Sequence, residues 1–444
     1  MTLLDPQSNR TLYTDALTPP PGFRFDCAVA LTYSLGLDTL LAVPLHLLLH
    51  ASGRAQTKLL KDRLAVLDGV RQVAGRLSIF HQNGRILAPR GPRILYSLLE
   101  NSVFRASAPR DGIFHPKVWL LRFSADADES APDRNGNAPL IRLAVLSRNL
   151  TADRSWDVSL TVEGRPENEE VDGNEALVRL LRALPECAPE LPEDRSVQIV
   201  SLAFDLARTA WELPDGIDDL RLHAIGLNGR EWLPPPSDRL VVMSPFCTEG
   251  ALERLAQTSD SARALISRPE ELVRMTQRSQ GATELFERCL VLRETAEADD
   301  DEDMSLRRGA HTGLHAKLYL CDEAGGTRLF VGSANSTHPA LIGATNVELM
   351  VELAGSEKRL GSVEEFLSND GFGALLEDFD PNDIDPPTPD EVEAKKLLER
   401  ACDAVAASNL RLSCQQADDG QGDNGRWQLE YMGCNPYIPI CAES

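Results

Sequence analysis

The chain has 444 residues, of which 42% are hydrophobic and 25% are charged, and its formal net charge is −23. This length allows two domains with cores of their own, and the composition is that of an ordinary soluble protein. The nine cysteines are scattered without a Cys-x-x-Cys pair, which argues for a reducing compartment and against structural zinc. No basic and apolar leader opens the sequence, so a cytoplasmic location is expected.

The most apolar stretch, residues 27–50, follows a proline-rich N-terminal arm. Asp38, Pro44 and His46 interrupt this stretch, whereas a membrane span needs about 20 predominantly apolar residues. We therefore predict a buried strand over 27–34, a buried helix over 38–50 and no transmembrane segment. Strands that alternate with helices from here onward indicate an α/β layer.

A basic segment follows, between Ala51 and Arg122. It contains 13 Lys or Arg against four acids, so this window carries +9 and the rest of the chain −32. A basic segment that leads into a polar motif is typical of a polyanion site, and we predict that Lys58, Lys61 and Arg63 bind nucleic acid. The alternative is a set of ordinary solvated helix faces, and charge alone leaves both interpretations open.

The first polar motif begins in FHPKVWLLRF, where His115 and Lys117 stand two residues apart in a predicted strand. Ser147 and Asn149 follow, and Asp157 then opens an apolar strand. Residues two apart project from one face of a strand, so the imidazole and the ammonium are expected side by side.

After Gly164 the chain becomes acidic and rich in proline, and RLVVMSPF at 239–246 then repeats the opening strand-then-helix pattern. A second motif follows in the same order as the first. Its residues are His315 and Lys317 in LHAKLYL, Ser333 and Asn335 at the end of TRLFVGSAN, and Glu348 in NVELMVEL. Because the order repeats, two unrelated surface strands are a poor explanation.

These residue types are those that cleavage of a phosphodiester needs. Lys and Asn side chains can hold the non-bridging oxygens, a His attacks phosphorus or protonates the leaving group, and a carboxylate orients the imidazole. No carboxylate or cysteine stands at ligand spacing beside His311 and His315, so no metal or cofactor is expected. The predicted catalytic residues are His115, Lys117, Asn149, Asp157, His315, Lys317, Asn335 and Glu348, with Ser147 and Ser333 in contact with the substrate.

The two motifs resemble the signature of the phospholipase D superfamily, which is His-x-Lys, four residues, Asp, and then Gly-Ser-x-Asn, present twice. The second copy fits through Asp322, whereas the first has Arg122 in place of the Asp and Leu146 in place of the Gly. SRNLTADRSWD is also similar to the Asn-containing motif of tyrosyl-DNA phosphodiesterases, a branch that lacks that Asp. The resemblance covers residues 25–355.

The resemblance implies an α/β fold of two phospholipase D-like half-domains, each a mixed sheet flanked by helices, related by a pseudo-twofold axis. The two His-x-Lys segments are expected to meet where the halves meet. The predicted order is an N-terminal arm (1–24), a first half (25–164), a connecting segment (165–237), a second half (238–356) and a C-terminal helical extension (357–444).

The resemblance also implies a metal-independent phosphodiesterase that works through a phosphohistidine, with His115 as nucleophile and His315 as general acid. Asp157 and Glu348 are the expected orienting carboxylates, each raising the basicity of a ring. We expect a bacterial-type nuclease of a restriction or phage-defence system, with DNA favoured over RNA, a helicase or ATPase partner, and no membrane. Two alternatives stay open: a phospholipase D or phospholipid phosphatidyltransferase, and a catalytically idle nucleic-acid-binding subunit.

Overall fold

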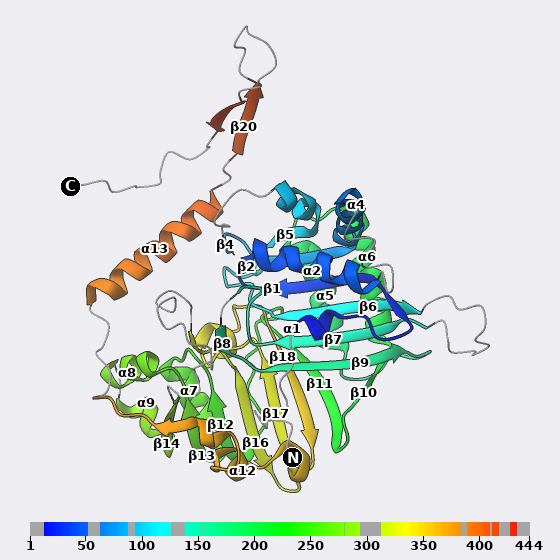
Figure 1. Cartoon of the computed structure of the whole chain (residues 1–444). Coiled ribbons are helices and arrows are strands. Elements are labelled where there is room, and N and C mark those ends of the chain that lie inside the picture. The colour runs from blue at the N-terminus through cyan, green and yellow to red at the C-terminus, as the bar shows by residue number, and fades with distance from the viewer. Residues whose placement is uncertain are drawn as a thin grey trace. The chain divides into compact units, whose positions relative to one another are not determined.

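The computed structural model describes residues 13–51, 63–87, 94–125, 138–152, 154–278, 280–293, 312–382, 389–408, 411–416 and 427–432. Contacts divide the chain into two compact units, Met1–Pro386 and Pro387–Ser444. The first unit holds both motifs and two large sheets. In Figure 1 the strands of the first sheet run across the view, and those of the second sheet run down it.

The first sheet has seven strands in the order β10-β9-β7-β6-β1-β3-β5. They are β1 (Phe23–Thr32), β3 (Leu77–Gln82), β5 (Val103–Ala106), β6 (Val118–Ala125), β7 (Leu140–Leu146), β9 (Ser159–Pro166) and β10 (Thr209–Glu212). β1, β3 and β5 are parallel to one another. On the other side of β1 lie β6, β7, β9 and β10, and each of these pairs with its neighbours in antiparallel fashion. The buried strand predicted near residue 27 is confirmed as β1.

The second sheet has eight strands in the order β11-β18-β17-β16-β12-β13-β14-β19. They are β11 (Ile217–Ile225), β12 (Ser237–Met243), β13 (Ser259–Ile266), β14 (Arg288–Leu292), β16 (Leu318–Glu323), β17 (Gly326–Gly332), β18 (Glu348–Gly355) and β19 (Leu376–Asp378). Apart from β19, the order and the directions of the strands repeat those of the first sheet. The predicted duplication of a mixed sheet is therefore confirmed.

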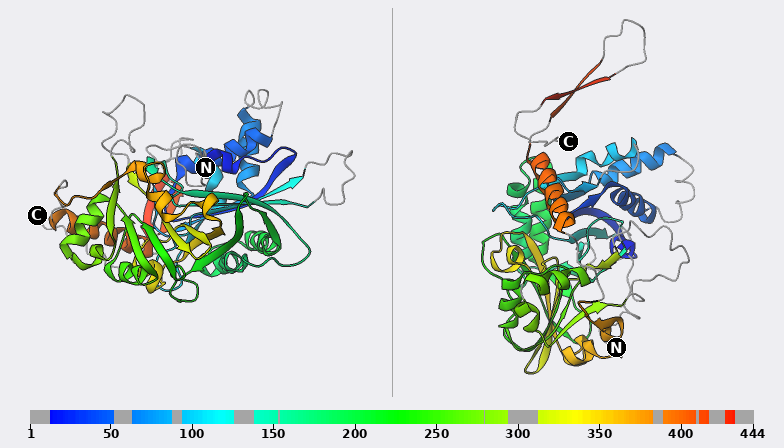
Figure 2. Two further views of the ribbon diagram at one scale, coloured as in Figure 1. Left: turned by 90° about the horizontal axis from the view of Figure 1, so that it is seen from below. Right: turned by 90° about the vertical axis from the view of Figure 1, so that its left-hand side faces the viewer.

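Helices cover the outer face of each sheet (Figure 2). On the first sheet they are α1 (Tyr13–Leu17), α2 (Leu37–Ala51), α4 (Arg63–Ala74) and the 3-10 helix η2 (Ile94–Ser102). On the second sheet they are α7 (Glu249–Ala256), α8 (Pro269–Arg278), α9 (Gln280–Glu284) and the π-helix η4 (His338–Ile342). The predicted helix over 38–50 is confirmed as α2.

The inner faces of both sheets share one core with α5 (Glu175–Cys187) and α6 (Glu193–Ala207). Val29 and Leu31 of β1 belong to this core, as do Leu318 and Leu320 of β16, while the residues between them face the outer helices. This two-residue alternation is expected of strands that are covered on both faces. The shared core holds the two halves together as one unit.

The predicted connecting segment, 165–237, contributes to both halves. Besides α5 and α6 it supplies β10 to the first sheet and β11 to the second. β19, from the predicted C-terminal extension, pairs with β14. The boundaries of the predicted domains stay a prediction.

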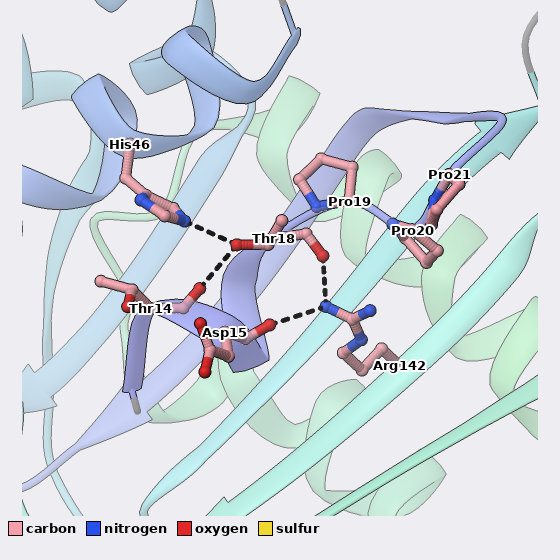
Figure 3. Close-up of a pocket in the computed structure, with 8 residues that line it drawn as sticks. All are labelled: Thr14, Asp15, Thr18, Pro19, Pro20, Pro21, His46 and Arg142. Carbon is pink, nitrogen blue, oxygen red and sulfur yellow. Dashed lines mark hydrogen bonds between the residues drawn. The ribbon is translucent and has the colours of Figure 1, made fainter. Parts of the chain in front are cut away.

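The described end of the N-terminal arm packs on the first sheet (Figure 3). The guanidinium of Arg142 on β7 donates to the carbonyl oxygens of Ala16 and Thr18, at 2.9 and 2.6 Å. His46 of α2 bonds the Thr18 hydroxyl at 2.8 Å. These contacts join residues 13–22 to the first half.

The C-terminal part contains the predicted helices and also strands. α11 (Glu357–Leu360), α12 (Val363–Leu367) and the 3-10 helix η5 (Phe372–Leu375) precede β19 in the first unit. The second unit consists of α13 (Pro389–Ala407) and an antiparallel pair, β20 (Arg411–Gln416) with β21 (Trp427–Met432). None of the helices among the described residues is long and apolar enough to cross a membrane.

Candidate active site

Both His-x-Lys segments lie directly before a central strand, residues 115–117 before β6 and residues 315–317 before β16. The prediction that these residues lie within the strands is wrong, because the main-chain N–H of each histidine bonds to the opposite half. The His115 N–H donates to the carbonyl of Val347 at 2.9 Å, and the His315 N–H donates to the carbonyl of Trp156 at 2.8 Å.

Each motif is thus anchored next to the carboxylate of the other half. Phe114 pairs with Val347, the residue before Glu348. The short strand β15 (Thr312–Leu314) runs parallel to β8 (Arg154–Trp156), which ends just before Asp157. The two motifs therefore meet at the interface of the halves, as the duplicated sequence predicts.

Gly112 permits the close approach on the first side. A Cβ atom there would lie 2.0 Å from the carbonyl oxygen of Thr345. Beyond it the Ile113 N–H donates to the side-chain oxygen of Asn346 at 3.1 Å, and the Val347 N–H donates to the Ile113 carbonyl at 2.9 Å. Only glycine lets the two main chains come this near.

Glu348 orients His115. Its carboxylate lies 2.8 Å from His115 Nδ1 and also accepts from the Ser333 hydroxyl and from the Asn346 amide. Burial opposes ionisation of Glu348, but the charge and hydrogen bond of His115 and the charge of Lys117 outweigh it, so the pKa of this carboxyl lies below its usual value. An ionised carboxylate only accepts hydrogen bonds, so Nδ1 of His115 carries the proton and Nε2 presents its lone pair.

Burial is the largest cause that lowers the pKa of His115, to about 4. The charge of Glu348 raises this pKa and the charges of Lys117 and Lys317 lower it. The Lys117 ammonium donates to His115 Nε2 at 2.8 Å. At neutral pH the ring is therefore uncharged, which is the form that a nucleophile needs.

The two motif lysines are buried, with 1% of each residue exposed. Burial first and the charge of Lys317 second hold the pKa of Lys117 well below its usual value. Lys317 Nζ donates to the carbonyl of His315 at 2.6 Å and reaches the carbonyl of Ser147, in the other half, at 3.5 Å. Two buried ammonium groups that disfavour each other make a site that favours an anion between them.

His315 has a different environment from His115. Among the described residues its Nδ1 has no hydrogen-bond partner. The corresponding carboxylate, Asp157, accepts from the Ser147 hydroxyl at 3.1 Å and lies 3.5 Å from Nε of Arg148. The shorter side chain is thus engaged within its own half.

Burial is the largest cause that lowers the pKa of His315, and together with the charges of Lys317, Arg268 and Lys117, in that order, it brings this pKa to about 2. The expectation that a carboxylate raises the basicity of this ring is not met, because Asp157 is held by Ser147 and Arg148. A proton on His315 at neutral pH therefore needs an added negative charge, such as a bound phosphodiester.

The two motif serines have a task other than the predicted contact with the substrate. Both residues are fully buried. The Ser147 hydroxyl donates to Asp157 and the Ser333 hydroxyl donates to Glu348. Each hydroxyl also accepts from the main-chain N–H of the residue after that carboxylate, Val158 or Leu349. The serines hold the carboxylates in place.

The motif asparagines, Asn149 and Asn335, are half-buried. The side-chain oxygen of each is buried without a hydrogen-bond partner among the described residues. A buried amide group with unmet hydrogen-bonding capacity is costly unless a ligand completes it. We therefore keep both asparagines as proposed ligands of the substrate.

Two hydroxyl residues missed by the sequence analysis fix these asparagines. Thr32 accepts from the Leu150 N–H at 3.0 Å, and Ser244 accepts from the Ser336 N–H at 2.9 Å. Each donor is the residue after a motif asparagine. Thr32 ends β1, and Ser244 follows β12, the equivalent strand. The repeated strand-then-helix opening is the signal that could have located them.

Each half also adds an aromatic ring and an arginine that the sequence analysis missed. The ring centroid of Tyr33 lies 5.1 Å from that of His115, and Cζ of Arg85 lies 5.6 Å from the Tyr33 centroid. In the second half Cζ of Arg268 lies 5.1 Å from the Phe246 centroid. All four residues follow the carboxyl ends of parallel strands, which is where sites form in such sheets.

The position of the signature Asp serves the fold in both halves. Asp322 lies five residues beyond Lys317 along β16, about 16 Å at the rise of a strand. It accepts from the Val363 N–H at 3.0 Å. Arg122, the corresponding residue, pairs with Asp26 and Asp205 at 2.6 and 2.9 Å.

Lys58 and Lys61 lie outside the described residues. Arg63 begins α4, but its side chain is also outside the description. Two other arginines of the basic segment, Arg105 and Arg122, pair with acids of the fold. Within the described ranges no group of three His, Cys, Asp or Glu could hold a metal ion.

No protein-family model matches the chain, and no curated protein matches it. Among solved structures it is similar to yeast tyrosyl-DNA phosphodiesterase, with a TM-score of 0.46 and 12% identity over 80% of this chain and 88% of that one. It is also similar to phosphatidylserine synthase of Haemophilus influenzae (TM-score 0.40, 10% identity, 88% and 90% covered). For polyphosphate kinase from Porphyromonas gingivalis the TM-score is 0.38 at 12% identity, with 89% and 52% covered. At TM-scores below 0.5 these similarities do not carry the functional proposal, which rests on the site.

Proposed function

We propose that this chain is a phosphodiesterase that cleaves nucleic acid, with DNA favoured over RNA, through a covalent histidine intermediate and without a metal. The observation that supports the proposal most is the joint site. It combines an uncharged imidazole, oriented by an ionised carboxylate of the opposite half, with two buried lysines and a second imidazole.

In the first step His115 Nε2 attacks phosphorus. A P–N bond forms, the P–O bond to the leaving group breaks, and His315 gives its proton to the leaving oxygen. Lys117 turns from Nε2 to a phosphoryl oxygen, and Lys317 with the two asparagines holds the others. This charge neutralisation is what a metal would otherwise supply.

In the second step water attacks the phosphohistidine. His315, now neutral, takes a proton from the water, the new P–O bond forms, and the P–N bond to His115 breaks. The product is a phosphomonoester, and both rings return to their starting protonation states. Glu348 stays ionised throughout and stabilises the positive charge that develops on His115.

The choice of nucleic acid rests on the basic segment and on the aromatic–arginine pairs beside the histidines. The same chemistry could act on a phospholipid diester, so the test includes one. A catalytically idle binding subunit would not need the His115–Glu348 contact. The proposed setting, a cytoplasmic restriction or phage-defence system with a helicase or ATPase partner, rests on the sequence resemblance alone.

The test is an activity assay in EDTA. The whole chain is incubated with end-labelled single- and double-stranded DNA and RNA of one sequence, and separately with phosphatidylcholine vesicles. We expect cleavage of DNA that EDTA does not stop. His115→Asn should lower the rate at least about 10⁴-fold, because the nucleophile is lost.

The matched control is His223→Asn. His223 lies on the edge strand β11 and bonds Glu352 at 2.7 Å, four residues along β18 from Glu348, so this variant should cleave as the wild type does. Cleavage of the vesicles alone would replace the nucleic-acid proposal by the lipid one. Binding of DNA without cleavage of any substrate would support the idle subunit.

A further inference from the structure

Helix α6 presents a row of apolar side chains to solvent. Val197 and Val200 are 64% and 56% exposed, and Phe204 is 57% exposed. Residues three and four apart share one side of a helix, so these side chains form a continuous row, while the opposite side of α6 is buried in the shared core. Single exposed apolar residues are ordinary on a protein surface, but a run of them on one helix face indicates a surface that binds another element.

Opposite charges close this row at its two ends. Glu193, four residues before Val197, is exposed in the first turn of α6, and Arg208, four residues after Phe204, follows the last residue of the helix. The Arg208 guanidinium lies over the ring of Phe204, with Cζ 4.0 Å from the centroid, and 3.5 Å from the carboxylate of Asp205. That ion pair is longer than a charge-assisted hydrogen bond, so a second carboxylate can bind the guanidinium more closely. The α6 stripe is therefore the row Glu193, Val197, Val200, Phe204 and Arg208.

The α6 stripe is complementary to itself when it is reversed. A twofold axis between positions 200 and 201 places Glu193 of one copy opposite Arg208 of a second copy, and Val197 opposite Phe204. Near the axis Val200 meets Val200 of the second copy. A parallel arrangement would instead place like charges together at both ends, which disfavours it. A surface that matches its own reverse is what an isologous dimer requires.

We infer that the α6 stripe is a dimer interface, covered by α6 of a second copy of this chain that packs on it antiparallel about a twofold axis. A nucleic acid is a poor occupant, because the stripe is apolar and Glu193 and Asp194 are exposed at its start. An unrelated protein would not require a row of residue types that matches its own reverse. One pair of helices buries less surface than a standard protein interface, so the dimer should dissociate in the micromolar range.

This dimer leaves the active site of each copy open. Arg195 of α6 donates to the carbonyl of Leu77, the first residue of β3, at 3.3 Å. Asp205 of α6 accepts from Arg122 at 2.9 Å, and Arg122 lies five residues beyond Lys117, about 16 Å along β6. Helix α6 therefore lies at the ends of the strands that point away from the motifs (Figure 1). The inference does not depend on the proposed function, and neither one stands or falls with the other.

Sedimentation velocity of the whole chain, from about 1 to 100 µM, tests the dimer. The mass should rise with concentration from 48.7 kDa toward twice that value. Val200→Asp should raise the dissociation constant at least about tenfold, because two carboxylates would meet at the axis without a partner. The matched control is Leu285→Asp, which changes an apolar residue of the second half that is 41% exposed, and it should dimerise as the wild type does.

An exchange of charges tests the antiparallel arrangement. Glu193→Arg alone and Arg208→Glu alone should each dimerise several-fold more weakly than the wild type, because each then places like charges at both ends of the interface. An equimolar mixture of these two variants should dimerise as the wild type does, because every pair at the ends of a mixed dimer again joins opposite charges. Thermal unfolding of each variant shows whether a lost dimer reflects a lost fold.

A wild type that stays at 48.7 kDa throughout would overturn the inference and would leave the stripe to another protein or to another segment of this chain. A dimer that folded Val200→Asp leaves unchanged would also overturn it, because the interface would then lie elsewhere. If Val200→Asp does not fold, the mixture decides: recovery of the dimer supports the antiparallel pair, and a mixture no better than its two components contradicts it.

Discussion

The two halves of the site have the same parts and different connections. In the first, the imidazole of His115 is held through Nδ1 by an ionised Glu348 from the opposite half. In the second, Nδ1 of His315 has no hydrogen-bond partner among the described residues, while Asp157 is held by its own half. The main-chain frame around both rings is nevertheless the same, down to the bond from each His N–H to the opposite half.

The difference comes from two residue changes at equivalent positions. Asp157 has one methylene fewer than Glu348, and Arg148 lies beside it where the second motif has Ala334. The duplicated main chain thus places both histidines in the same way, and single side chains beside them give the two rings different properties. An oriented, uncharged ring suits the nucleophile, and a ring that gains its proton only with a bound anion suits the general acid.

The largest expected effect compares the two carboxylates. Glu348→Gln should lower the single-turnover cleavage rate by about 10³-fold, because a side-chain amide can leave His115 in the wrong tautomer. Asp157→Asn should cost less than about tenfold. Rapid-quench measurements on both variants, with binding of substrate measured separately, check this. Equal losses would mean that the halves are equivalent after all.

The sequence predicts this site because its strongest signal is the repeated order of residue types. His-x-Lys, Ser-x-Asn and a carboxylate recur in one order, and repeated order implies repeated structure. The contacts that distinguish the halves were out of reach. Whether Glu348 contacts His115 or His315 depends on how the two halves are arranged. The spacing of residues within one motif does not predict this arrangement.

Other errors have local causes. The motif histidines were placed inside strands because LHAKLYL alternates, yet the N–H groups of 115 and 315 bond to the opposite half. The serines were given to the substrate because hydroxyls accompany phosphate sites, whereas both are buried behind carboxylates. Arg268 and Phe246 escaped notice because residues at the ends of parallel strands gather from distant parts of the chain.

A second prediction concerns the pH dependence of stability. The pKa of His115 is about 4 and that of His315 about 2 in the fold, against 6.5 for an exposed ring. Below pH 6.5 the unfolded chain therefore binds more protons than the folded one, so stability falls as pH falls, by at most about 1.4 kcal/mol per pH unit for each ring.

The two histidines should differ in the pH at which their contribution to this loss of stability ends. The contribution of His115 should stop near pH 4, whereas that of His315 should continue toward pH 2. Urea unfolding of the wild type, His115→Asn and His315→Asn between pH 7 and pH 3 measures it. Each variant should flatten the slope between pH 6.5 and 4, and only His315→Asn should flatten it below pH 4. Parallel curves for all three proteins would show that neither ring is buried uncharged.

The smallest expected effect concerns Arg148. Arg148→Ala removes the cation beside Asp157, so the carboxylate can act on His315 and the pKa of that ring should rise by up to about one unit. NMR titration of the ring follows the change, and the cleavage rate should change by less than about tenfold. Ala334→Arg, the mirror change in the second motif, should weaken the His115–Glu348 contact and slow cleavage more. An unchanged His315 titration would mean that Arg148 does not restrain Asp157.

The central claim is that one site, shared by the halves, uses His115 as its nucleophile. Trapping of the covalent intermediate tests it most directly. The protein is mixed with a substrate labelled at the scissile phosphate and quenched in base, where phosphohistidine survives, and the labelled residue is mapped by mass spectrometry. The account predicts label on His115, and longer persistence of that label in His315→Ala, because the second histidine activates the water that removes it. Label on His315, or no covalent adduct while cleavage proceeds, would contradict it.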